Sequence, residues 1–213
     1  MEYKKAVVEA GKKMLDKGLT VETFGNISIY DRKNSLVYIS PSGMPYYTLE
    51  ESDIPVLSID GGIVDGRTKP SIETGLHLAL YRARPDVSAV VHTHSIYSCV
   101  FAAMDKEIPL FHDEAVHILR DTVRVAEYAT AGSESLAQNC VNAIGDEARA
   151  CLLKAHGAVC VAENIDECFK VTVVLEMMAQ IYQLALSAGG QCRPLSKENI
   201  THIRHFSKTV YGK

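Results

Sequence analysis

Short apolar runs of β type constrain the fold of this chain more than any other feature. Three of them (NISIY, LVYIS and VLSID) fall between positions 25 and 64, where turn residues such as Pro41, Ser42 and Gly43 separate them. Another run covers 87–92, and the segment ACLLKAHGAVCVA at 150–162 has the pattern of a strand, a turn and a second strand. The middle of the chain is therefore expected to form a sheet.

Helical patterns precede, separate and follow these runs. Gly18 suits the C-terminal end of the first helix, and Ser95 is placed to cap a helix that follows the run at 87–92. The first helix is expected at 2–17, and further helices are expected at 72–84, 134–144, 165–188 and 196–210. This order predicts an α/β fold, a three-layer α/β/α domain with a mostly antiparallel or mixed central sheet. The uneven strand spacing argues against a doubly wound nucleotide fold. No repeat or linker divides residues 1–213, so one domain is expected.

Composition excludes several classes of function. A net charge of -4 and a pI near 6.1 give no general attraction to nucleic acid or to an anionic membrane. The apolar segment 168–188 contains Lys170, Glu176 and two glutamines, which makes it too polar to span a bilayer. The six cysteines form no C-x-x-C pair, and the N-terminus lacks the apolar stretch of an export signal. A cytoplasmic protein with reduced cysteines is expected.

The segment VVHTHS at 90–95 carries the strongest chemical signal. On a strand, positions i and i+2 point to the same face, so His92 and His94 would lie side by side. Neutral imidazole is a good ligand for zinc, and a catalytic zinc site typically uses three protein ligands and leaves one position open. His156, at the end of another apolar run and followed by a glycine, is a candidate third ligand. Each histidine, taken alone, has a structural explanation.

Glu73 and two glycine-containing loops complete the candidate site. Glu73 opens a helix, where a carboxylate can serve as a cap, as a metal ligand or as a general base. The loops Gly25-Asn26-Ile27-Ser28 and Ser40-Pro41-Ser42-Gly43 offer small donors that could bind a phosphate without a net positive charge. Either loop could also be a plain turn.

These signals occur in an order that resembles the class II aldolase/adducin family. The series GNIS, SPSGM, KPSIETGLH, VVHTHS and AHG runs through the chain, and the resemblance extends to the terminal YGK. It implies a three-layer subunit in a homotetramer with active sites between subunits. It also implies zinc, one ion per subunit, bound by His92, His94 and His156, with Glu73 completing the site when substrate is absent.

The resemblance also implies a phosphate site and further catalytic groups. The family's phosphate-binding positions correspond to Asn26, Ser42, Gly43 and Ser71, and its interfacial C-terminal tyrosine corresponds to Tyr211. Two positions depart from the family pattern. Ile72 stands where many members have a second serine. Asp113, followed by Glu114, stands where many have a catalytic tyrosine.

The resemblance implies a metal-dependent aldehyde-lyase. The expected substrate is a small phosphorylated sugar, a ketose 1-phosphate of the L-fuculose 1-phosphate type. Cleavage between carbons 3 and 4 would give dihydroxyacetone phosphate and an aldehyde such as L-lactaldehyde, through an enediolate stabilised by the metal. Glu73 would move the proton at carbon 3, and Tyr211 or Asp113 of a neighbouring subunit would serve the hydroxyl at carbon 4.

Several alternatives remain at the level of sequence. A pentulose-5-phosphate 4-epimerase would use the same metal and the same bond cleavage, although such epimerases tend to have aspartate where this chain has Glu73. A methylthioribulose-1-phosphate dehydratase is a third enzyme of this type. An adducin-like structural domain would share the fold but lack the metal histidines. An unrelated α/β protein would contain these histidines by coincidence.

Overall fold

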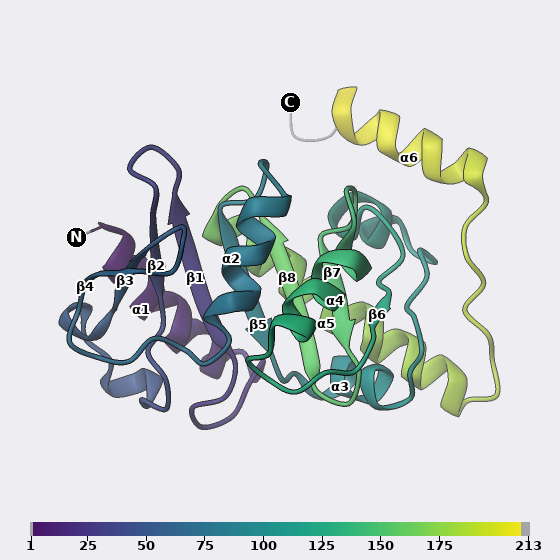
Figure 1. Ribbon diagram of the computed structural model, residues 1–213. Coiled ribbons are helices and arrows are strands. Elements are labelled where there is room, and N and C mark those ends of the chain that lie inside the picture. The colour runs from purple at the N-terminus through teal and green to yellow at the C-terminus, as the bar shows by residue number, and fades with distance from the viewer. Residues whose placement is uncertain (1, 210–213) are drawn as a thin grey trace.

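One sheet joins all the strands of the computed structural model, which describes residues 2–209 (Figure 1). Every neighbouring pair is antiparallel except β6 and β7, which are parallel. The order across the sheet is β4 (Ile63–Asp65), β3 (Val56–Ser58), β2 (Leu36–Ile39), β1 (Asn26–Asp31), β5 (Ala89–Thr93), β8 (Gly157–Ala162), β7 (Ala150–Leu153) and β6 (Val125–Ala126). The mostly antiparallel sheet expected from the sequence is confirmed, and a doubly wound arrangement is excluded.

Helices cover both faces of this sheet. The first face carries α2 (Thr74–Ala83) and α4 (Glu134–Ile144), and the second carries α1 (Glu2–Asp16), α3 (Ile96–Ala103) and α5 (Ile165–Ser187) (Figure 1). A last helix, α6 (Lys197–Thr209), lies outside these layers.

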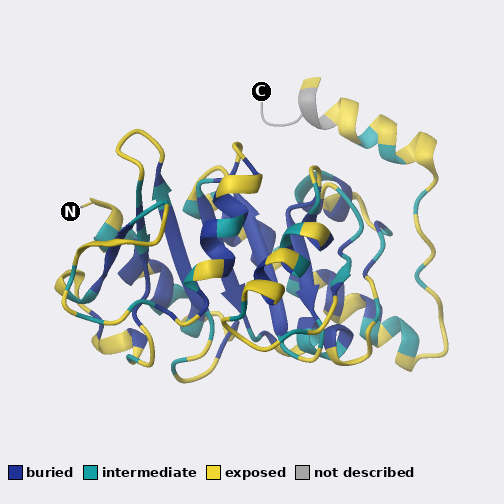
Figure 2. Ribbon diagram, in the orientation of Figure 1, coloured by how far each residue is buried: buried dark blue, intermediate teal, exposed yellow. Residues whose placement is uncertain are grey.

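Alternate residues of the central strands enter two separate cores. Val90 and Val159 pack with α2 and α4, whereas Val91 and Cys160 pack with the helices of the other face. This alternation follows from the two-residue period of a strand, and it makes the central strands apolar on both sides. Figure 2 shows the resulting buried sheet between helices whose outer surfaces are exposed. The predicted three-layer α/β/α fold is confirmed.

Helix α5 has more apolar surface than its packing against the sheet requires. Of the described helices it alone is long and apolar enough to cross a membrane, judged by length and composition. The sequence-based expectation that its polar residues rule out a membrane span is therefore wrong as an argument from composition alone. The packing of α5 is that of a core helix, because eight of its residues, including Val171, Leu175 and Met178, are buried within the fold. A partly exposed apolar stripe runs along its outer side and consists of Val173, Met177, Ile181 and Leu184.

The start of α3 differs from the prediction. Ser95 does precede the helix, but its side chain makes no capping hydrogen bond. The carboxylate of Glu176 on α5 takes that role instead, and it accepts hydrogen bonds from the backbone amides of Tyr97 (2.8 Å) and Ser98 (2.9 Å). Glu176 thereby ties the segment that follows His94 to the neighbouring helix.

A π-helix covers Ala115–Leu119 and had no clear signal in the sequence. It ends at Arg120, whose φ of 69° lies in the left-handed region. By contrast, the predicted end of the first helix at Gly18 is confirmed, because α1 ends at Asp16 and Gly18, two residues later, has a φ of 64°.

Candidate metal centre

Strand β5 carries the predicted histidines to one edge of the sheet. It lies between β1 and β8, both antiparallel to it, so the end of β5 meets the beginnings of its two neighbours. Asn26, the first residue of β1, is paired with His92, and Gly157, the first residue of β8, directly follows His156. The antiparallel topology therefore brings together motifs that are far apart in the chain.

His92, His94 and His156 converge on one point, as the sequence predicted. Their ring centroids lie 4.8 to 5.0 Å apart, and each pair of rings is close to perpendicular. The Nε2 atoms of His92 and His94 are 3.1 Å apart. Two nitrogens bound to a tetrahedral zinc at about 2.0–2.1 Å would lie about 3.3 Å from each other. The spacing of the imidazoles therefore suits a shared metal ion.

Gly157 allows this close approach. A Cβ atom at this position would collide with the carbonyl oxygen of Thr93, and it would lie 3.0 Å from His94 Cδ2 and 3.2 Å from His92 Cε1. The glycine of the AHG motif is thus required by the packing of the imidazoles against the hairpin. Gly25 has a similar role on the other side, where a Cβ would strike the carbonyl oxygen of His92.

The protonation of the imidazoles favours metal binding. His92 Nδ1 lies 3.0 Å from the carbonyl oxygen of Ala158, a group that only accepts, so Nδ1 carries the proton and Nε2 keeps a free lone pair. Burial, together with neighbouring imidazoles, lowers the pKa of His94 to about 4. Burial and His92 also lower the pKa of His156. These two rings are therefore neutral near pH 7, the state in which imidazole binds a metal.

The Glu73 side chain is turned towards the histidines. It occupies the N-cap position of α2 but makes no capping hydrogen bond, so the capping explanation of this residue is not supported. Its Oε2 atom accepts a hydrogen bond from Asn26 Nδ2 (2.8 Å) and lies 3.2 Å from His92 Nε2. Its Oε1 atom is buried without a hydrogen-bond partner and lies 3.7 Å from His156 Nε2.

This unpartnered oxygen supports a cation at the centre. Buried polar atoms are almost always hydrogen-bonded, yet this carboxylate oxygen has no donor within hydrogen-bond distance. A divalent metal bound to the three imidazoles would supply the missing positive charge. Burial acts to raise the pKa of the Glu73 carboxyl, but the neighbouring imidazoles and the Asn26 amide outweigh it and hold that pKa below its usual value. The residues present fit a divalent metal.

The loops predicted to bind phosphate are joined to each other by backbone hydrogen bonds. Ser42 N donates to Lys69 O (2.9 Å), and Ser71 N donates to Ser40 O (3.2 Å). Ser40 in turn exchanges hydrogen bonds with Ile27, the residue after Asn26. Three segments, each a weak signal when taken alone, are therefore hydrogen-bonded to one another beside Glu73. Ser42 and Gly43 are exposed, whereas Asn26 and Ser71 are buried.

The remaining predicted residues lie elsewhere or outside the described part of the chain. Asp113 is exposed, in the segment that precedes the π-helix, and the cluster of metal-ligating groups within residues 2–209 does not include it. Tyr211 lies outside the described residues. Ile72 is 68% exposed, so its side chain is available to a ligand at the surface.

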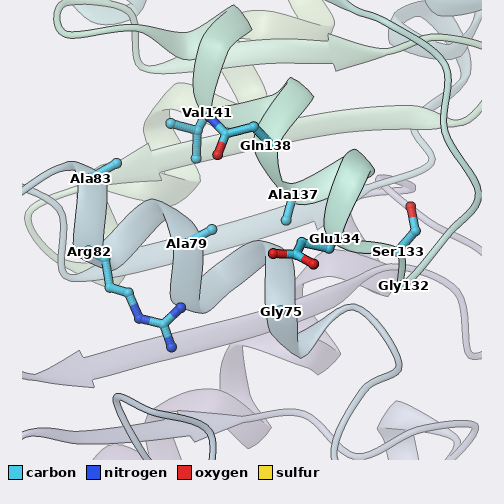
Figure 3. A pocket seen from close by; sticks show the side chains of 10 residues that line it. All are labelled: Gly75, Ala79, Arg82, Ala83, Gly132, Ser133, Glu134, Ala137, Gln138 and Val141. Carbon is cyan, nitrogen blue, oxygen red and sulfur yellow. The ribbon is translucent and has the colours of Figure 1, made fainter.

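A groove of about 640 Å³ lies apart from the histidine cluster, between α2 and α4 (Figure 3). Its lining includes Arg82 from α2 and Glu134 and Gln138 from α4. None of the three histidines lines it. The groove belongs to the outer surface of the helical layer.

Sequence reasoning missed a buried polar chain next to Glu73. His77 Nε2 lies 2.5 Å from Asn26 Oδ1, and Ser28 Oγ lies 2.6 Å from both His77 Nδ1 and Tyr81 OH. Burial lowers the pKa of His77 to about 3, so its ring is neutral. The available signal was the spacing of Glu73, His77 and Tyr81, which repeats every four residues on one side of a helix.

Comparisons with known proteins agree with this arrangement. Residues 5–183 match the family described as Class II Aldolase and Adducin N-terminal domain. The chain belongs to the class II aldolase and adducin family. A 5-deoxy-D-ribulose 1-phosphate aldolase of Bacillus thuringiensis serovar kurstaki is 42% identical over 183 residues, which are 86% of this chain and 85% of the relative.

Two further proteins show how far the similarity extends. An L-fuculose phosphate aldolase of Methanococcus vannielii is 36% identical over 82% of this chain and 92% of its own length. A solved structure of an L-fuculose 1-phosphate aldolase is 36% identical, with a TM-score of 0.92 over 97% of this chain and 96% of that chain. By family and by these relatives, the chain is an enzyme of the class II aldolase type, an aldehyde-lyase.

Proposed function

We propose that this chain is a zinc-dependent aldolase that cleaves a ketose 1-phosphate of the L-fuculose 1-phosphate type. The products would be dihydroxyacetone phosphate and an aldehyde such as L-lactaldehyde. The observation that carries the proposal is the convergence of three imidazoles beside Glu73, whose buried Oε1 atom has no hydrogen-bond partner. The names of two similar proteins add support, because the Bacillus relative and the solved structure are each described as the aldolase of a ketose 1-phosphate.

The three histidines and Glu73 would have different roles in the reaction. His92, His94 and His156 would hold the zinc, which as a Lewis acid would offset the negative charge that develops on the ketone fragment. Glu73 would take part in binding the metal before substrate arrives. Its carboxylate would afterwards be free to act as the acid and base at carbon 3.

The proton balance of cleavage needs two protein groups. The bond between carbons 3 and 4 breaks when the hydroxyl at carbon 4 gives its proton to a base and becomes the carbonyl of the aldehyde. The electron pair of the bond stays with carbon 3. The Glu73 carboxylate would first take up a proton from water and then pass it to carbon 3, while the base at carbon 4 would return its proton to water, so that the protons balance. The base for the hydroxyl at carbon 4 would be Tyr211 or Asp113 of a neighbouring subunit. The exposure of Asp113 is compatible with such a contribution across an interface.

The phosphate would be bound by hydroxyl, amide and backbone groups. Asn26, Ser42, Gly43 and Ser71 lie on segments that are hydrogen-bonded to each other beside Glu73. A charged group that accepts several hydrogen bonds is held strongly even where no lysine or arginine takes part. This arrangement would fix the phosphate end of the substrate.

We further propose that residues 1–213 form one domain that assembles into a homotetramer in the cytoplasm. The exposed apolar stripe of α5 supports an assembly, because a contact between subunits would remove Met177 and Leu184 from water. All six cysteines are free thiols, which is usual in a reducing compartment.

One experiment tests the reaction. The purified protein, loaded with zinc, is incubated with a panel of ketose 1-phosphates and pentulose 5-phosphates, and the release of dihydroxyacetone phosphate and the formation of epimers are both measured. Dihydroxyacetone phosphate from a ketose 1-phosphate is expected. Epimer formation without it would replace the aldolase by a 4-epimerase, and neither product would refute the proposed function.

A further inference from the structure

Helix α2 and strand β1 are in register where they face each other. Glu73, His77 and Tyr81 follow one another at intervals of four residues, an advance of about 6 Å along a helix. Asn26 and Ser28 are two residues apart on one face of β1, an advance of about 6.8 Å along a strand. The side chains of α2 and those of β1 therefore have nearly the same spacing, and each side chain of one row can contact a side chain of the other row.

The hydrogen bonds of these two rows form one chain with a defined direction. Glu73 Oε2 only accepts when ionised, so Asn26 must turn its NH2 group towards it (2.8 Å) and its Oδ1 atom towards His77. His77 Nε2 must then be the donor to Oδ1 (2.5 Å), which leaves Nδ1 as an acceptor. Ser28 Oγ donates to Nδ1 and accepts from Tyr81 OH.

Burial makes this direction hard to reverse. Ser28 and His77 have no exposed surface, and Asn26 and Tyr81 are 4% and 2% exposed, so no solvent can replace a lost partner. A neutral imidazole has one donor and one acceptor, and both are used here. If the Asn26 amide turned over, its oxygen would face the Glu73 carboxylate and its NH2 group would face a donor.

We propose that His77 is a positioning residue that holds the Asn26 amide with its NH2 group towards Glu73 and towards the bound phosphate. Asn26 Nδ2 has two hydrogens, of which Glu73 takes one and the other remains for a phosphate oxygen. The inference rests on the proposed function, because Asn26 is a phosphate ligand only if the substrate is a sugar phosphate. His77 itself touches neither the substrate nor the metal, and it acts through Asn26.

Two variants with the same chemical group test this role. In His77→Gln the amide nitrogen can occupy the place of Nε2 and can still donate to Asn26. In His77→Asn the side chain is one methylene shorter than glutamine, so its amide can reach Ser28 but cannot reach Asn26. Both variants lose the ring and leave a similar cavity, and the pair therefore separates the hydrogen bond to Asn26 from packing.

The measurement is the affinity for dihydroxyacetone phosphate by calorimetry on zinc-loaded protein, with dihydroxyacetone as the control ligand. Zinc content and the thermal midpoint are recorded for each protein. We expect His77→Asn to raise the Kd for dihydroxyacetone phosphate about 10- to 100-fold, the range for one hydrogen bond to a charged group. His77→Gln should stay within about 3-fold of the wild type. Binding of dihydroxyacetone should change little in either variant.

Each other outcome counts against the inference. Equal affinities of both variants and the wild type for dihydroxyacetone phosphate would overturn it and leave the proposed function standing. Equal losses for both ligands would mean that His77 is only structural. A wild-type protein that binds no dihydroxyacetone phosphate would refute the proposed function and this inference together.

If His77→Asn does not fold, Ser28→Ala provides a second test of whether His77 positions the Asn26 amide. Without the Ser28 hydroxyl, His77 Nδ1 loses its partner. Nε2 still donates to the amide oxygen of Asn26, but the ring is then held at one nitrogen only and fixes the amide less firmly. We expect a smaller rise in the Kd for dihydroxyacetone phosphate, about 3- to 10-fold. An unchanged Kd in a folded Ser28→Ala protein would overturn the inference.

Discussion

Replacing Glu73 with glutamine separates its chemical role from its structural one. The amide keeps the size of the carboxylate, and its oxygen can still accept the hydrogen bond that Asn26 donates to Oε2. The amide NH2 group would then occupy the place of Oε1, which is 3.7 Å from His156 Nε2 and has no hydrogen-bond partner. The substitution therefore removes the charge and the ability to take a proton, with little change in shape.

The expected loss of turnover is large. A general acid or base typically contributes about 100- to 10,000-fold to the rate, which is about 2.7–5.4 kcal/mol at 1.36 kcal/mol for each factor of ten. Glu73 is only 5% exposed, so bulk water cannot readily take over its proton transfer. We expect kcat to fall by this amount while zinc stays close to about one ion per subunit at saturating metal, because the three imidazoles remain.

The assay measures kcat, KM and zinc content for wild type, Glu73→Gln and a control, Glu134→Gln. Glu134 is a suitable control because it also stands at the beginning of a helix, α4, and is exposed. Its replacement should leave kcat within about 2-fold of the wild type, as expected for surface substitutions. A loss below about 5-fold in Glu73→Gln would refute the acid and base role. Loss of the zinc together with the activity would make Glu73 mainly a metal ligand.

Three other predictions follow from the same site and surface. His92→Ala and His156→Ala should each abolish zinc binding and activity, and full zinc content in both would contradict the metal assignment. Ile72→Ser should lower the KM for a sugar phosphate by up to about 10-fold, because it adds a hydrogen-bond donor to the phosphate loop. Ser71→Ala should raise this KM without loss of zinc. Equal effects of these substitutions on the KM for the unphosphorylated sugar would mean that the phosphate binds elsewhere. Leu184→Asp, at the exposed stripe of α5, should break up the assembly and reduce activity in light-scattering and rate measurements, and a fully active wild-type monomer would refute the tetramer.

Much of the architecture could be predicted from the sequence because it depends on local patterns. The alternation of residue types marked the strands, and the apolar periodicity marked the helices, including α4 and α5. His92 and His94 could be paired because two residues on a strand share a face, and this is a property of the backbone alone. His156 was a candidate ligand from its place at the end of an apolar run, but only the family resemblance assigned it to the same site, since β8 comes more than 60 residues later in the chain and lies beside β5 only in the folded sheet.

Only the tertiary structure decided how the polar groups are partnered. Ser95 is a good capping residue by type, yet Glu176, 79 residues away from Tyr97, caps α3 because α5 packs against it. Glu73 could be a cap or a ligand by sequence, and the registry of α2 on β1 turned its side chain to the histidines and lined up His77 behind Asn26. Residue type determines which hydrogen bonds a side chain can make, whereas the packing of distant segments determines which of those partners comes within reach.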